Sequence, residues 1–114
     1  MKIKINGNCY REFNSMIQTC ANDREDEIHG GLFTALYNAK YVGGKGKAWV
    51  AELNPEQIKQ FVHMIDKQSE YMEFVTIDEM KSDQSPAKAI KEIRYDIWCL
   101  RKLMTNLEQI LEAK

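Results

Sequence analysis

Residues 85–114 read SPAKAIKEIRYDIWCLRKLMTNLEQILEAK, and one regular spacing of apolar residues runs through them. Ser85 and Pro86 form a helix start, because serine caps helix N-termini and proline is favoured at the first helical position. Apolar residues then recur at alternating steps of three and four residues, which is the a/d heptad pattern of one long helix. This stripe comprises Ile90, Ile93, Ile97, Leu100, Met104, Leu107 and Leu111.

The length of this helix predicts self-association. At about 1.5 Å per residue it would be about 40–45 Å long, whereas a compact chain of this size has a diameter of about 35 Å. The end of the stripe would then lie beyond the domain, and a second copy of the chain is its simplest cover. The sequence therefore predicts a homo-oligomer, a dimer or higher, in which Arg94 and Arg101 at e positions face Asp96 at a g position.

The composition is that of one soluble globular domain and argues against several function classes. The chain has 114 residues, of which 44% are hydrophobic, and 16 basic and 17 acidic side chains give a net charge of −1. This balance argues against coating of DNA or membranes by bulk charge. No apolar run suits a signal peptide or a membrane span, and Cys9, Cys20 and Cys99 include no close pair. We expect a cytoplasmic protein with reduced thiols and no cofactor.

Turn and strand signals elsewhere predict an α+β body over residues 1–84, to which residues 85–114 add the long C-terminal helix. The clearest signal is a β-hairpin, because Gly43 to Gly46 separate two extended runs. Residues 32–42 suit a helix or a strand, with strand favoured in their second half. The predicted order is β-α-β-β-α-β-α, a small antiparallel sheet covered by helices. The other segments are a strand at 2–5 that ends in a turn at 6–8, a helix ending near 20, a solvated loop at 23–31, a helix at 54–72 that begins with the capping sequence Asn54-Pro55-Glu56-Gln57, a strand at 74–77 and a linker at 81–84.

Two aromatic residues on the predicted terminal helix lie off its apolar stripe. Tyr95 and Trp98 are one turn apart, and Lys91 and Lys102 flank them. They could widen the apolar face that packs on the chain's own sheet. Because aromatic anchors are enriched at protein interfaces, we instead predict a partner-binding surface here.

An acidic run provides a second candidate surface. Its carboxylate spacing departs from that of a calcium-binding loop, so no metal site is predicted. The run is either a solvated loop or a patch that meets a basic partner surface or imitates nucleic-acid phosphates. The residues concerned are Asp23, Glu25, Asp26 and Glu27.

The hairpin mixes cations with aromatic rings. Proteins that bind single-stranded nucleic acid use such a mixture for backbone contact and base stacking. The glycines at 43–46 lack the spacing of a phosphate-binding loop, and a hairpin turn explains them. A small nucleic-acid-binding regulator is therefore one alternative function, with Lys40, Tyr41, Lys45, Lys47 and Trp49 as its contacts.

No set of residues meets the minimum for catalysis, which is a nucleophile or metal with a positioned base and an anion-stabilising group. His29 is expected in a loop and His63 on a solvated helix face. In size, in its acidic segment and in its self-associating helix, the chain resembles small accessory proteins of phages and mobile elements, among them anti-CRISPR and other anti-defence inhibitors. The resemblance implies a non-enzymatic inhibitor or adaptor that occludes a surface of a larger host protein or complex.

A further alternative is an oligomer that sequesters a nucleotide-like ligand between its subunits. Arg94 or Arg101 would bind the phosphate, and Tyr95 or Trp98 would stack on the ring.

Overall fold

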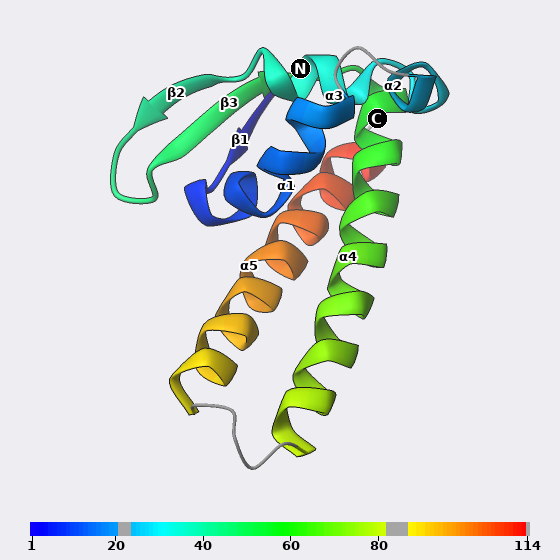
Figure 1. The fold of residues 1–114 in the computed structure, drawn as a ribbon. Helices are drawn as coiled ribbons and strands as arrows, with labels where there is room; N and C mark the ends of the chain where they lie inside the picture. Colours follow the sequence, from blue (N-terminus) through cyan, green and yellow to red (C-terminus); the bar gives the residue numbers. More distant parts are fainter. Residues whose placement is uncertain (21–23, 82–86, 114) are drawn as a thin grey trace.

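The structure, a computed structural model, describes residues 1–20, 24–81 and 87–113. Within them the chain forms an α+β fold, as predicted, in which one small sheet packs against helices (Figure 1). The predicted helix start at Ser85 and Pro86 lies outside the described residues. The elements are β1 (Lys2–Ile5), α1 (Gly7–Cys20), α2 (Arg24–Ile28), α3 (Leu32–Tyr37), β2 (Lys40–Gly43), β3 (Ala48–Glu52), α4 (Pro55–Lys81) and α5 (Ala87–Glu112).

The sheet is antiparallel, with β3 at its centre between β1 and β2. The predicted hairpin is confirmed, because Gly43 and Gly44 take the left-handed backbone conformation that its turn needs, with φ of 72° and 83°. The register sets Tyr41 directly opposite Trp49. Two aromatic rings are thereby paired across the hairpin.

Helix α4 begins with the capping arrangement expected from the sequence. The side chain of Asn54 accepts a hydrogen bond from the Gln57 backbone N–H at 2.8 Å, and Gln57 Oε1 accepts one from the Asn54 N–H at 2.9 Å. Pro55 is the first helical residue. The helix is 27 residues long and ends at Lys81, beyond the predicted end at residue 72.

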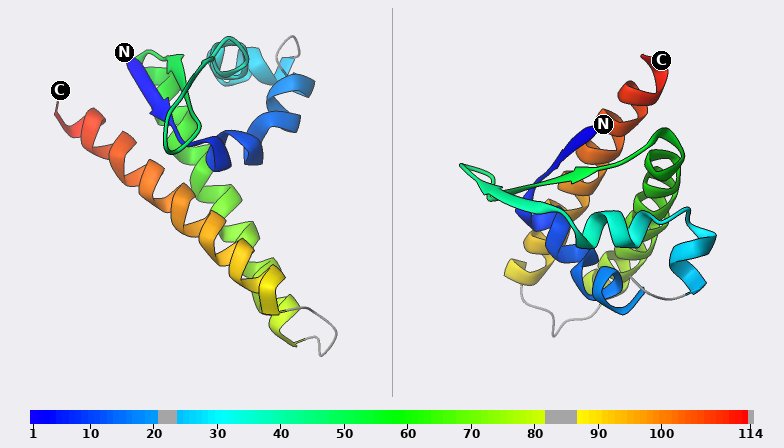
Figure 2. Two further views of the ribbon diagram at one scale, coloured as in Figure 1. Left: turned by 90° about the vertical axis from the view of Figure 1, so that its left-hand side faces the viewer. Right: turned by 90° about the horizontal axis from the view of Figure 1, so that it is seen from above.

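The strand predicted at 74–77 is therefore wrong, since these residues belong to α4. The prediction relied on the local β propensity of Phe74-Val75-Thr76-Ile77. In the fold, α5 returns alongside α4, and this packing outweighs local propensity (Figures 1 and 2). The prediction of a solvated loop at 23–31 is also wrong in part, because residues 24–28 form the short helix α2.

The helical hairpin of α4 and α5 extends away from the sheet, so the terminal helix does project as expected (Figure 2). Its stripe nevertheless has a cover within the same chain. Ile97, Leu100 and Leu107 are buried, and the remaining stripe residues are partly buried. Because α4 supplies that cover, the length of α5 no longer requires a second copy, and the homo-oligomer stays a prediction.

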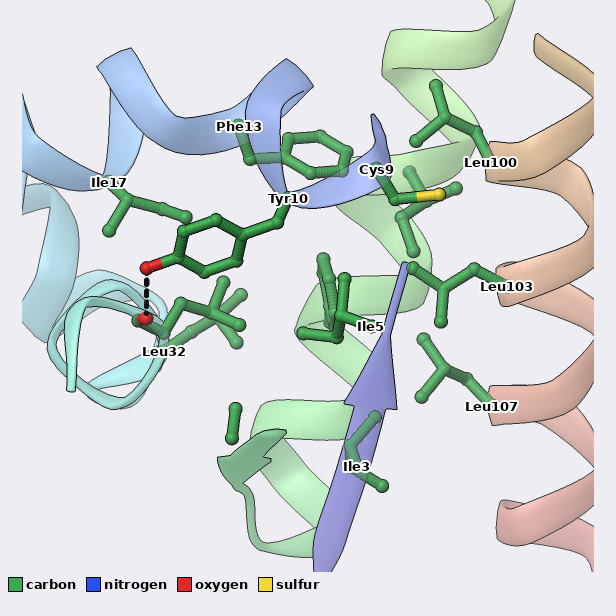
Figure 3. Packing of buried hydrophobic residues seen from close by; sticks show 14 of the residues in the cluster. Ile3, Ile5, Cys9, Tyr10, Phe13, Ile17, Leu32, Leu100, Leu103 and Leu107 are labelled. Carbon is green, nitrogen blue, oxygen red and sulfur yellow. Dashed lines mark hydrogen bonds between the residues drawn. The ribbon is translucent and has the colours of Figure 1, made fainter. Parts of the chain in front are cut away.

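Side chains from the α4–α5 pair and from the sheet belong to one hydrophobic core. Leu103 and Leu107 point from α5 toward β1, and Tyr10 of α1 donates a hydrogen bond from its hydroxyl to the Leu36 carbonyl at 3.0 Å (Figure 3). Phe13 of α1 meets Phe61 of α4 edge to face, with ring centroids 5.7 Å apart. Helix α1 is thus fixed between the hairpin strands and α5, where the candidate site lies.

Candidate functional site

Two hollows lie where the turn of the β-hairpin, the start of α1 and the outer face of α5 meet. The first has a volume of about 460 Å³ and lies toward α5. The second, of about 790 Å³, lies toward the hairpin. Both are lined by Asn6, Gly46 and Tyr95, so the two hollows adjoin at these residues, and together they are called here the groove.

The junction of the two hollows is held by backbone contacts. The Gly7 N–H donates a hydrogen bond to the Gly46 carbonyl at 3.0 Å. Asn6 caps α1, because its Oδ1 accepts a hydrogen bond from the Asn8 N–H at 2.8 Å. A Cβ atom at Gly7 would lie 2.7 Å from the Lys47 carbonyl oxygen, so only glycine allows this approach. The hairpin turn is thereby fixed against the start of α1.

Three aromatic rings form a cluster at the hairpin end of the groove. Trp49 stacks on Tyr10 with ring centroids 4.3 Å apart and an interplanar angle of 8°. Tyr41 meets Trp49 at 5.2 Å and 63°. Tyr10 is buried and Tyr41 is 56% exposed. The cluster therefore has a rigid base and an accessible rim.

A second aromatic pair lies at the α5 end. The rings of Tyr95 and Trp98 are 6.0 Å apart at 27°, and the Lys102 ammonium lies 4.9 Å from the Trp98 ring centroid. Their exposed fractions are 51% and 55%. Trp98 thus lies outside the core of the chain, which removes the reading in which it packs on the chain's own sheet.

Cations surround these rings. Lys4 and Lys102 line the first hollow, and Arg11, Lys45 and Lys47 line the second. Among the described residues no acidic side chain lines either hollow. None of the four lysines forms an ion pair with a described residue. In a chain of net charge −1, the charged side chains that line the described part of the groove are therefore all positive.

Acidic and thiol groups lie behind the groove, between α1 and α5. Asp96 lies 3.8 Å from Arg11 in an ion pair. Burial raises the pKa of Glu12, as do the charge of Asp96 and a hydrogen bond with it, while Arg11 lowers it. Burial, with Cys99 and the nearby carboxylates, raises the pKa of Cys9 to about 12. Cys9 is buried, and a thiol with so high a pKa is protonated at neutral pH.

Of the residues predicted as binding contacts, the groove collects members of two separate predictions. Tyr95, Trp98 and Lys102 came from the terminal helix. Tyr41, Lys45, Lys47 and Trp49 came from the hairpin. Lys91 and Lys40 are exposed but line neither hollow.

The arginines assigned to a nucleotide-like ligand also lie outside the groove lining. Arg101 forms an ion pair with Glu73 of α4. Arg94 lines neither hollow. Asp96 lies 3.8 Å from Arg11 of its own chain, and the pairing of either arginine with Asp96 across an oligomer stays a prediction.

The acidic segment is only partly available to a partner. Asp26 is buried, and its carboxylate accepts hydrogen bonds from the Thr34 N–H at 3.0 Å and the Thr34 hydroxyl at 2.5 Å. It therefore anchors the start of α3. Glu27 is exposed on α2. Asp23 and the side chain of Glu25 lie outside the described residues.

A third hollow, of about 450 Å³, lies elsewhere and contains both histidines. His29 and His63 line it together with Met16, Phe33 and residues of α4. The His29 ring meets Phe33 edge to face at 5.2 Å. In the described part of the chain, no three His, Cys, Asp or Glu side chains gather in a way that could hold a metal ion.

Sequence reasoning missed several groove residues. The sequence predicts Asn6 and Gly7 only as part of a turn, although the Gly7 N–H donates the hydrogen bond that holds the junction. Strand alternation could have identified Lys4 as an exposed residue, because it lies between the buried Ile3 and Ile5 and must face outward. Nothing in the sequence marks Arg11, whose position depends on how α1 meets the hairpin.

Comparison with protein-family models, curated proteins and solved structures finds no match to this chain. No described helix combines the length and the apolar character that a membrane crossing requires.

Proposed function

We propose that the protein is a non-enzymatic inhibitor or adaptor that occupies a surface of a larger host protein or complex, with the groove as its binding surface. One observation carries the proposal: exposed aromatic side chains from two segments distant in sequence line two adjoining hollows, whose lysines form no ion pair with a described residue. Folding leaves Tyr41 and Trp98 more than half exposed, so burial in the core does not account for them. Exposed aromatic residues gathered in this way are typical of interaction sites.

The general resemblance to small phage accessory proteins supports the same proposal, since such proteins act by covering a surface of a larger host complex.

The predicted oligomer of this chain does not depend on the proposal that the groove binds a partner. Light scattering at micromolar concentration would give the mass of at least a dimer if the chain self-associates. A monomer mass at every concentration would refute self-association and leave the groove proposal intact.

Affinity capture from a bacterial lysate with matched variants tests the proposal. Trp98→Ala removes an anchor of the groove, whereas Phe74→Ala removes an aromatic residue that is 63% exposed on α4 and lines neither hollow. Loss of a buried aromatic anchor weakens a complex by about 30- to 1000-fold. We expect Trp98→Ala to lose the captured partner and Phe74→Ala to retain it. Equal capture by both variants would refute the groove as the binding surface.

Nucleic-acid binding is the second candidate, and one observation favours it. Lys45 and Lys47 of the hairpin line the same hollow as Tyr95, whereas Lys40 lines neither hollow.

A further inference from the structure

We infer that the ligand of the groove is single-stranded nucleic acid, so that the larger partner presents an unpaired strand to this protein. The inference rests on the proposed function, because it uses the same groove, and it names the chemistry that the groove would recognise.

The aromatic rings of the groove form two clusters, and each cluster, called here a station, offers rings for base stacking. At one, Tyr10 backs Trp49 and leaves Tyr41 exposed at the rim. At the other, Tyr95 and Trp98 are both about half exposed, at 51% and 55%. Bases of an unpaired strand stack on such rings, whereas a duplex hides the ring faces of its bases. The exposed rings therefore favour a single strand over a duplex.

The cations of the groove suit a phosphate backbone. Lys45 and Lys47 lie at one station and Lys4 and Lys102 at the other, and none of them has an ion-pair partner among the described residues. Lysine is depleted from protein interfaces, where arginine is enriched, but it is a common contact to nucleic-acid phosphates. The choice of lysine therefore favours nucleic acid over an acidic protein surface.

The apolar residues that line the groove also favour nucleic acid as the ligand. The large hydrophobic residues that are exposed along the described lining are the three aromatics Tyr41, Tyr95 and Trp98. Exposed aliphatic residues, Ile28 and Val42, line neither hollow. A groove of flat rings and cations without exposed aliphatic side chains matches the chemistry of bases and phosphates.

The two hollows also set the size of the ligand. Each has a volume in the range of small-ligand sites, which is about 300–1,000 Å³. They meet at Asn6 and Gly46, so a ligand that occupies both stations must reach across this junction. A short strand fits this requirement, with one base at each station and its backbone across the junction.

Fluorescence anisotropy with a labelled single strand of about 12 nucleotides, a length within the usual site size, tests the inference. The unmodified protein should bind the strand, and affinity should fall as potassium chloride rises. Trp98→Ala should weaken binding by about 5- to 150-fold, the effect of one lost stacking contact. Tyr41→Ala should do the same at the other station, which keeps the test valid if one variant fails to fold.

A second pair of variants tests the phosphate contacts. Each phosphate contact with a single strand contributes about −0.7 to the slope of log affinity against log salt, so Lys45→Gln with Lys47→Gln should flatten the slope by about 1.4. Lys59→Gln with Lys67→Gln is the matched control, because these exposed lysines of α4 line neither hollow of the groove, and it should leave slope and affinity unchanged.

Several results would overturn the inference. The first is no binding of the single strand at low salt. The second is equal binding of a duplex of the same length with no effect of either aromatic variant, which would mean attraction to surface charge alone. The third is displacement of the strand by polyglutamate at equal charge, which would indicate an acidic protein partner.

The failure of this inference can be told apart from failure of the proposed function. If the strand does not bind while lysate capture still depends on Trp98, the groove binds a protein and only the inference is wrong. If neither capture nor strand binding depends on Trp98, both proposals are wrong.

Discussion

Both faces of α5 carry large apolar side chains, but the fold covers only one of them. The inward face is sealed by α4 and β1, where Leu100 and Leu107 are fully buried. The outward face leaves Tyr95 and Trp98 about half exposed, beside Lys4 and Lys102, which form no ion pair within the described part of the chain. A heptad stripe therefore marks a surface that will be covered without saying which chain covers it. What remains exposed after folding is the better guide to a partner.

Exposure alone does not define the site, as α4 shows. Tyr71 and Phe74 on α4 are each 63% exposed, more than Trp98. They line none of the hollows described above. The face of α5 differs from them in having a hollow, a cluster of cations and a second aromatic station opposite.

The largest effect is expected on the covered face of α5. Leu100→Ala removes buried methyl groups and leaves a cavity, which should lower the free energy of unfolding by about 2–5 kcal/mol. Urea denaturation followed by circular dichroism measures this change. A loss below about 1 kcal/mol would mean that the inward face contributes little to the fold.

The next effect concerns the junction that joins the hairpin station to the α5 station. In Gly7→Ala the new Cβ would lie 2.7 Å from the Lys47 carbonyl oxygen, a backbone atom that cannot move away alone. We expect a loss of about 1–3 kcal/mol in the free energy of unfolding. In the control Gly46→Ala the nearest atom, at 3.1 Å, ends the Asn6 side chain, so the loss should be smaller. Equal losses would show that the junction is not tight at Gly7.

A smaller, pH-dependent effect is expected behind the groove. The pKa of Glu12 is raised in the folded state, so its stabilising contribution is complete below the ordinary pKa of 4.5 and is lost as pH rises through the folded value. Glu12→Gln imitates the protonated carboxyl. It should leave stability unchanged near about pH 4 and raise it near about pH 7.

Denaturation of both proteins at the two pH values measures this difference. Glu108→Gln, at an exposed position of α5, is the control and should change stability at neither pH. A stability gain at low pH alone would contradict the sign of the Glu12 pKa shift.

Local patterns were enough to predict the hairpin, the capped start of α4 and the terminal helix, since each depends on residues close together in the sequence. The strand predicted at 74–77 failed because α4 is stabilised there by α5, which follows it in the chain. The groove could not be predicted as one site. Its residues come from β1, α1, the hairpin and α5, and the Gly7 to Gly46 contact that joins them has no sequence signature.

The free energy of unfolding of Trp98→Ala tests the contrast between the two faces of α5 most directly. Trp98 is 55% exposed and contacts Tyr95 and Lys102, so its removal should cost about 1 kcal/mol or less, far below the cost of Leu100→Ala. A folded, nearly unperturbed Trp98→Ala protein that has lost its partner is the predicted result. A loss of stability equal to that of Leu100→Ala would show that Trp98 holds the fold together, and would contradict the account.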